Sequence, residues 1–152
     1  MKAVEVRLNR PSNRQEWVRA VILVGVVYFI IGFGFGELAK LSLFGTVGVW
    51  RLGAWVASAV VAAAHIFYER FRLRHSPLMA ALHVAVAVAL GAFLLALAAI
   101  VHASMVPIHA PYWQYFLALV LWPIITGVPS FLIALLAATI LGHLAPKTGL
   151  QK

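Results

Sequence analysis

The sequence predicts an all-α integral membrane protein, a four-transmembrane-helix bundle with both the N- and C-termini in the cytoplasm. Hydrophobic residues make up 64% of the 152 residues and charged residues 11%. A soluble domain averages roughly 45–50% apolar and about 25% charged residues. Four apolar runs are long enough to cross a bilayer, which needs about 20 residues per helix. The basic residues flank these runs asymmetrically, and this bias indicates the orientation.

The first predicted span covers residues 17–38 and follows a polar, basic N-terminal segment, residues 1–16. A cleaved signal peptide is the alternative, but its apolar core would be about 7–15 residues long and would end at a small-residue cleavage site. This run is longer, and Glu37 near its end makes a poor cleavage site. We therefore expect an uncleaved span, followed by a short interfacial connection over residues 39–50.

The second and third predicted spans cover residues 51–72 and 78–103. Pro77 marks the turn between them, because proline is favoured at the start of a helix and not in its interior. A turn this short predicts that the two spans pack against each other as an antiparallel hairpin. Residues 104–111 contain two prolines and form the next predicted loop.

The fourth predicted span covers residues 112–144, which would be roughly 50 Å long as a continuous helix at about 1.5 Å per residue. Pro123 and Pro129 fall inside it. The sequence leaves open whether this run forms one kinked or tilted helix or two broken pieces. The predicted membrane domain is thus residues 17–144, and residues 145–152 form a short tail.

The orientation follows from lysine and arginine. All but Lys40 and Arg51 of the 12 basic residues lie before or at the start of the first span, at the end of the second span or just after it, or after the fourth span. The positive-inside rule therefore predicts cytoplasmic termini. The same charges predict contact with anionic lipid headgroups and not with nucleic acid. The compact chain, its alanine content and this charge bias together suggest a bacterial inner membrane.

Small residues line two of the predicted helices and indicate close helix packing. The alanines of the third span recur at steps of three and four, which places them on one helix face. These candidate interface residues are Gly25, Gly32, Gly36, Ala85, Ala89, Ala92 and Ala96. Packing within the chain is the favoured interpretation. The alternative is a surface for another membrane protein or for a second copy.

His65, Glu69 and His83 are the candidate cofactor-binding residues. His65 and Glu69 are four apart and share a helix face. The depths of His65 and His83 in the membrane should differ by about 6 Å, judged from their distances along the helices to the turn. Ionisable residues within a span are costly and are often functional. We therefore expect the three side chains to cluster near the inner boundary of the membrane.

Three chemistries fit this cluster, beside a purely structural hydrogen bond. Histidine and glutamate suit zinc, iron or manganese. Two histidines on facing helices suit the axial ligation of haem b. Histidine also suits a proton or quinone site. The sequence itself defines no catalytic residues and no set of metal ligands, and Glu37 is expected to pair with Arg51.

The tiny loops and the absence of cysteine, aspartate and recognisable catalytic motifs favour a non-enzymatic function. We expect an accessory or interaction subunit of a membrane complex. One alternative is a haem- or quinone-binding redox protein that uses His65 and His83. Another is a small oligomeric transporter or channel that uses Glu37 or Glu69.

Overall fold

Four long helices make up the protein. The computed structural model describes residues 13–41, 46–105 and 111–144. The helices are α1 (Asn13–Leu41), α2 (Val47–Phe67), α3 (Pro77–Ser104) and α4 (Tyr112–Leu144), and α2 continues into a short π-helix, η2 (Tyr68–Arg72). There is no strand within the described ranges. Most of the predicted N-terminal segment 1–16 and all of the predicted tail 145–152 lie outside the described residues.

Each of the four helices is long and apolar enough to cross a membrane, as the sequence predicts. The predicted connection over residues 39–50 is wrong at both ends, because α1 runs on to Leu41 and α2 already begins at Val47. Thr46 adopts the extended backbone conformation of an N-cap residue. The apolar residues on both sides of the connection extend the helices and leave a shorter link between them.

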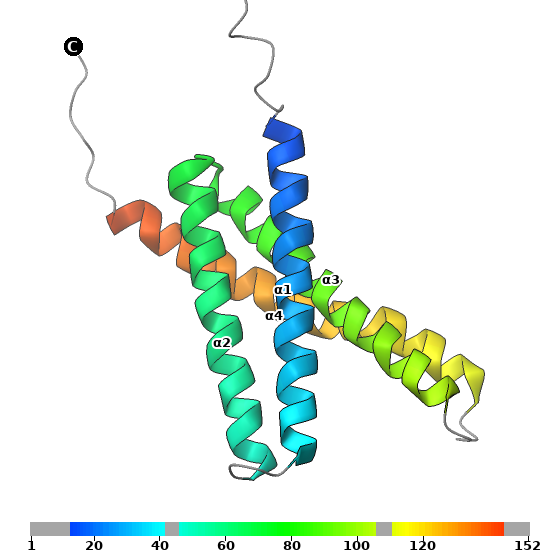
Figure 1. Ribbon diagram of the computed structural model, residues 1–152. Coiled ribbons are helices and arrows are strands. Elements are labelled where there is room, and N and C mark those ends of the chain that lie inside the picture. The colour runs from blue at the N-terminus through cyan, green and yellow to red at the C-terminus, as the bar shows by residue number, and fades with distance from the viewer. Residues whose placement is uncertain (1–12, 42–45, 106–110, 145–152) are drawn as a thin grey trace, which may run out of the picture.

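The helices form two pairs that cross obliquely. α1 and α2 lie side by side, and α3 and α4 form the second pair behind them (Figure 1). The most extensive contacts join α3 to α4, followed by those between α1 and α3 and between α1 and α2. The predicted tight hairpin of the second and third spans is wrong, since α2 meets α3 at few positions. α3 packs mainly against α1 and α4 instead.

Glycines bring the backbones of α1 and α3 together where they cross. A Cβ atom on Gly91 would lie 2.6 Å from the Cβ atom of Tyr28 and 3.0 Å from the carbonyl oxygen of Gly25. A Cβ atom on Gly25 would lie 2.7 Å from the side chain of Leu90. Close approach of this kind is how small residues strengthen helix packing in lipid.

Alanines and one glycine perform the same role between α3 and α4. A Cβ atom on Gly127 would lie 3.3 Å from the Cβ atom of Ala89 and 3.5 Å from the carbonyl oxygen of Ala85. A core cluster continues this seam toward the end of the bundle near η2, and it consists of Ile66, Ala80, Ala81, Val84, Ala134 and Ala138. The tightest part of the protein is therefore built from its smallest side chains.

The candidate interface residues divide between interior and surface. Gly25, Ala85 and Ala96 are buried within the chain, and Ala89 and Ala92 are half-buried. Gly32 faces the side chain of Leu95 on α3, whereas a Cβ atom on Gly36 would meet nothing within 4 Å in the described part of the chain. Of these residues, Gly36 is the one whose surroundings are open.

α4 is one continuous helix that includes both Pro123 and Pro129, which settles the alternatives that the sequence left open. The Thr126 hydroxyl donates a hydrogen bond of 2.8 Å to the carbonyl oxygen of Trp122, and the Ser130 hydroxyl donates one of 2.7 Å to that of Thr126. Such side-chain donors provide partners for backbone carbonyls around the prolines of membrane helices.

Candidate metal centre

The turn between α2 and α3 has an uncommon geometry. In η2 the Leu73 amide donates to the carbonyl oxygen of Tyr68 at 3.2 Å, and the His75 amide donates to that of Glu69 at 3.0 Å. Arg74 adopts a left-handed conformation with φ of 54°. Arg70 Nη1 donates to the carbonyl oxygen of His75 at 2.7 Å. Together these features fold His75 back onto Glu69, and π-turns of this kind are frequent at functional sites.

Ser76 then starts α3 and fixes its direction. The Met79 amide donates to Ser76 Oγ at 3.3 Å, the Ala80 amide donates to the Ser76 carbonyl oxygen at 3.0 Å, and Pro77 occupies the first turn. A serine cap followed by proline is a strong signal for the start of a helix. The cap places His83, two turns into α3, opposite Glu69.

Three imidazole rings surround the carboxylate of Glu69, whose side chain is 0% exposed. Glu69 Oε2 lies 2.5 Å from His75 Nδ1 and 2.9 Å from His83 Nδ1. Glu69 Oε1 lies 3.4 Å from His65 Nε2. We call His65, Glu69, His75 and His83 the histidine cluster. It combines ligands from α2, η2, the turn and α3.

Some polar atoms of the histidine cluster have no hydrogen-bond partner among the described residues. They are both ring nitrogens of His65 and the Oε1 atom of Glu69. The 3.4 Å contact between His65 Nε2 and this oxygen is near enough for attraction but lacks the geometry of a hydrogen bond. Buried polar atoms are nearly always satisfied. These unsatisfied atoms are therefore available to a ligand.

The spacing of these atoms suits a metal ion. Donor atoms of Glu69, His75 and His83 all lie within 4.8 Å of one another. In a tetrahedral zinc site, ligand atoms at about 2.0–2.2 Å from the ion are separated by about 3.3–3.6 Å. The contacts of 2.5 and 2.9 Å to Glu69 Oε2 would have to lengthen to admit an ion. His65 contacts the other carboxylate oxygen at 3.4 Å, lies outside this group of three, and would have to move toward the ion to join it.

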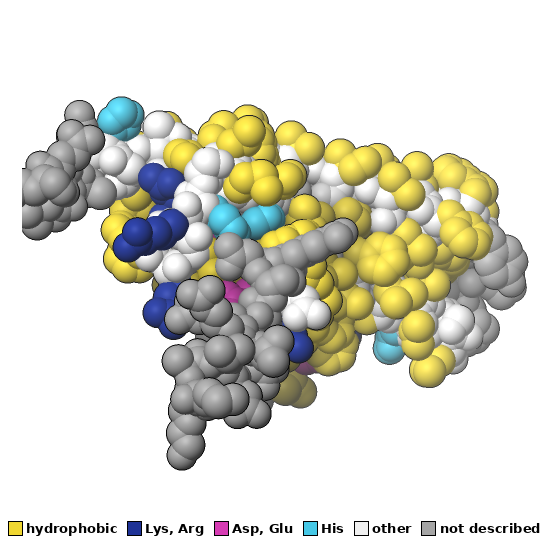
Figure 2. Space-filling view, turned by 90° about the horizontal axis from the view of Figure 1, so that it is seen from above, with side chains coloured by type: hydrophobic (Ala, Val, Ile, Leu, Met, Phe, Trp, Pro, Cys, Tyr) yellow, Lys and Arg dark blue, Asp and Glu magenta, His cyan; other side chains and the backbone are white. Residues whose placement is uncertain are grey.

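An aromatic ring from α1 covers one side of the histidine cluster. Trp17 stacks on His83 with parallel planes and ring centroids 4.7 Å apart. The side chains of His65 and His83 are 1% and 3% exposed, whereas that of His75 is 21% exposed. Figure 2 shows this end of the molecule, with histidine side chains at the surface beside lysine and arginine. Access from solvent is therefore greatest along His75.

The structure brings together His65, Glu69 and His83, the candidate residues from the sequence, and adds two that sequence reasoning missed. His75 follows the basic residues between the second and third predicted spans, and Trp17 stands at the start of the first span, so neither was a candidate from the sequence. His75 could have been noticed from its residue type, six positions after Glu69. Its inward orientation depends on the π-turn and on the left-handed Arg74, which no sequence pattern indicates.

The charged residues at the opposite end do not form a comparable site. Lys40 Nζ lies 2.6 Å from Glu37 Oε1, and the Glu37 side chain is 46% exposed. The predicted pairing of Glu37 with Arg51 is therefore wrong. Lys40 is three residues away on the same helix and is easily reached. Arg51 is exposed and has no ion-pair partner in the described ranges.

Comparison with protein-family models, with curated proteins and with solved structures found no significant match to this chain. The chemistry of the histidine cluster follows from its own donor set. Three imidazoles and one carboxylate form a mixed nitrogen and oxygen site without sulfur, because the chain has no cysteine. Such a set suits zinc, iron or manganese and disfavours ions that require thiolates.

Proposed function

We propose that this protein binds one divalent transition-metal ion in the membrane, through His65, Glu69, His75 and His83. The observation that carries the proposal is the convergence of three imidazoles on one fully buried carboxylate. A carboxylate buried in an apolar helix is costly unless positive charge compensates it. A divalent ion supplies that charge and also provides partners for the unsatisfied atoms of His65 and Glu69.

The donor set favours zinc first and iron or manganese next. Glu69, His75 and His83 already lie at ligand spacing, and with His65 as the fourth ligand the set of nitrogen and oxygen donors would match tetrahedral zinc. Magnesium and calcium prefer sites made entirely of oxygen atoms. The histidine cluster supplies one carboxylate and three imidazoles, so we expect little affinity for either of these ions.

The same geometry disfavours haem b held between His65 and His83. Two axial histidines approach the iron from opposite faces of a porphyrin, which needs a flat open space between them. His65 and His83 instead both contact one carboxylate, at 3.4 and 2.9 Å, and Trp17 covers a face of His83. We expect the purified protein to show no Soret absorption band.

Metal analysis of the purified chain tests the proposal. After loading with zinc in mild detergent and removal of free ion by gel filtration, we expect a metal-to-protein ratio near one. Glu69→Gln and His83→Gln should each weaken zinc binding by at least the 10–100-fold that loss of an outer-shell partner costs. His102→Gln and His143→Gln are matched controls, because both side chains are exposed and lie outside the cluster. A ratio near zero in the unaltered chain would overturn the proposal.

We further propose that the histidine cluster faces the cytoplasm and that the host membrane is a bacterial inner membrane. Arg19, Arg70, Arg72 and Arg74 all lie near this end of the helices, which supports the orientation. The chain lacks cysteine, so single cysteines can report the topology. In intact cells, a membrane-impermeant maleimide should label Ser104→Cys and leave Arg72→Cys unlabelled. The opposite pattern would reverse the orientation.

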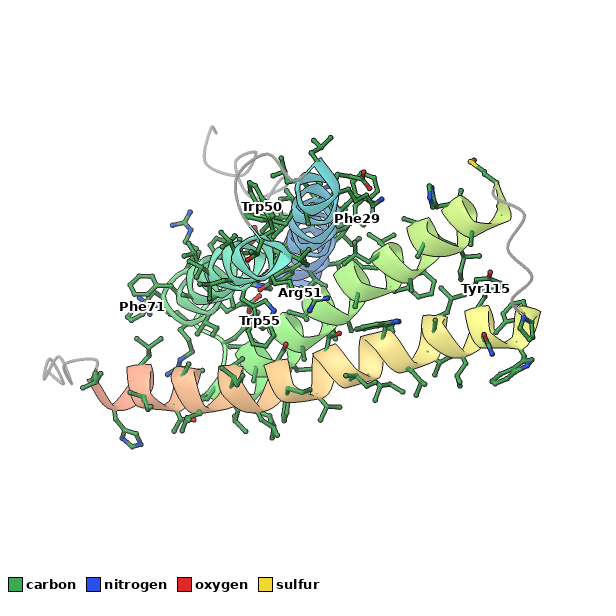
Figure 3. The ribbon with its side chains drawn as sticks, turned by 90° about the horizontal axis from the view of Figure 1, so that it is seen from below. Phe29, Trp50, Arg51, Trp55, Phe71 and Tyr115 are labelled. Atoms are coloured by element: carbon green, nitrogen blue, oxygen red, sulfur yellow. The ribbon has the colours of Figure 1, made fainter. Side chains whose placement is uncertain are left out.

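A role as an accessory subunit of a membrane complex, or as a homo-oligomer, is a second candidate. Exposed side chains on the side of α2 nearest α3 favour this role. Figure 3 shows Arg51 and Trp55 on that side. Trp55 is 78% exposed there. Large aromatic and arginine side chains are common at the centres of interfaces. A pull-down in mild detergent that recovers a specific partner with the intact chain, but not with Trp55→Ala, would support this role.

A further inference from the structure

A groove lies on the surface of α2 and η2, and none of its lining residues belongs to the histidine cluster. Its volume is about 550 Å³, and it is lined by Ala64, Phe67, Tyr68, Phe71 and Arg72. The groove is shallow and wide open to its surroundings. Figure 3 shows Phe71 pointing away from α3 and α4. The groove therefore faces the surroundings of the protein and not its interior.

The groove has an apolar part and a cationic end. Phe67 and Phe71 form its aromatic wall, with ring centroids 4.2 Å apart. Arg72 stands at the last position of the apolar segment Val47–Arg72, where a membrane helix meets the headgroup region. No carboxylate in the described part of the chain lies within ion-pair distance of Arg72. Glu69, three residues away, is fully buried among histidines.

We propose that this groove binds one anionic phospholipid. The acyl chain would lie against Phe67 and Phe71, and the phosphate would contact Arg72. Three features support a lipid over a second copy of the chain or a soluble ligand. The groove is mostly apolar, it lies on a helix apolar enough to cross a membrane, and its one charged lining residue, Arg72, stands at the end of that helix. Arginine is well suited to bind phosphate in a bidentate manner. The proposal does not depend on the metal site.

Native mass spectrometry of the full chain in mild detergent tests the proposal. Phosphatidylglycerol and phosphatidylcholine with identical acyl chains are titrated separately. A basic residue near an anionic headgroup contributes about 1 kcal/mol, so we expect about fivefold tighter binding of one phosphatidylglycerol. Arg72→Gln should abolish this preference. Arg51→Gln, at the other end of α2, is the matched control and should retain it. Phe71→Ala should weaken the binding of both lipids.

Four outcomes would overturn the proposal. The first is equal binding of the two lipids to the unaltered chain. The second is an equal loss of preference in Arg72→Gln and Arg51→Gln. The third is displacement of the lipid by inorganic phosphate, which would indicate a headgroup-only anion site. The fourth is a dimer that excludes lipid, which would show that a second copy covers the groove. Zinc content measured in the same samples separates failure of this site from failure of the metal centre.

Discussion

The two ends of the α1–α2 pair each contain a glutamate, but the two glutamates have opposite surroundings. At one end, Glu69 is fully buried and contacts His65, His75 and His83. At the other end, Glu37 is 46% exposed and forms an ion pair with Lys40 alone among the described residues. Both glutamates lie near the end of an apolar helix. Their surroundings differ because a π-turn and the start of α3 enclose one of them, whereas α1 simply ends beside the other.

This difference shows that the burial of its carboxylate distinguishes the candidate site. An ionisable residue near the end of a span is not sufficient. An exposed ion pair contributes little, because water and salt screen it. The buried Glu69 carboxylate and the unsatisfied ring of His65 are costly to bury, and a bound ion would stabilise both. The contrast leads to four comparisons of matched variants, given from the largest expected effect to the smallest.

Removal of Glu69 should lower the stability of the protein far more than removal of Glu37. Glu69→Ala is expected to lower the free energy of unfolding by about 3–5 kcal/mol, because it breaks a buried charged network and leaves its partners unpaired. Glu37→Ala should cost less than about 1 kcal/mol, as is usual for an exposed pair. Denaturant unfolding in mild detergent measures both values. Equal losses would show that the two environments do not differ as described.

Glycine substitutions test the close crossing of α1 and α3. Gly91→Ala places a Cβ atom 2.6 Å from the Tyr28 Cβ atom, so α1 and α3 must separate. We expect a loss of about 1–3 kcal/mol from this overpacking. Gly36→Ala meets nothing within 4 Å and should be neutral, or stabilising by up to about 1 kcal/mol through helix propensity. A neutral Gly91→Ala would argue against the close crossing of α1 and α3.

Trp17 should contribute to stability and to zinc binding through its contact with His83. Trp17→Leu removes the stacked ring, and we expect a loss of about 0.5–1.5 kcal/mol beyond the change in buried area. Zinc binding should weaken by a few-fold, since His83 is then held less firmly. Trp55→Leu is the control, because this ring is 78% exposed and lies on a different helix. Similar effects of the two changes on zinc binding would contradict this role.

Substitution of Arg74, the left-handed residue of the turn, should have the smallest effect on stability. Arg74 has φ of 54°, which costs a residue other than glycine roughly 1–2 kcal/mol. Arg74→Gly relieves this strain but increases the freedom of the unfolded chain, so we expect a net gain below about 1 kcal/mol. Arg72→Gly, within η2, should instead lose up to about 1 kcal/mol. A clear loss in Arg74→Gly would mean that the Arg74 side chain itself holds the turn.

The sequence alone predicted the four apolar helices and the proximity of His65, Glu69 and His83, because hydropathy and helical spacing are local properties. It did not predict that α3 would pack mainly on α1 and α4. That choice depends on which small residues face one another, such as Gly25 and Gly91, and not on the length of the connecting turn. It also missed the position of His75, which is set by backbone geometry.

The ends of the helices show a further limit of sequence reasoning. Glu37 was expected to reach Arg51 across two helices, yet Lys40 lies closer on its own helix. Likewise, Pro123 and Pro129 left the continuity of the fourth span open, and the hydroxyl groups of Thr126 and Ser130 bond to carbonyls beside them. Both regions contain contacts between residues three or four positions apart on one helix, which hydropathy and proline positions do not reveal.

X-ray absorption spectroscopy of the zinc-loaded protein tests the central claim most directly. We predict a first shell of about four nitrogen and oxygen atoms at about 2.0–2.1 Å, with outer-shell scattering from three imidazole rings. Glu69→Gln should lose this signal, and Glu37→Gln should keep it. A shell of oxygen atoms without imidazole scattering, or an identical spectrum for the two variants, would contradict a metal centre formed by His65, Glu69, His75 and His83.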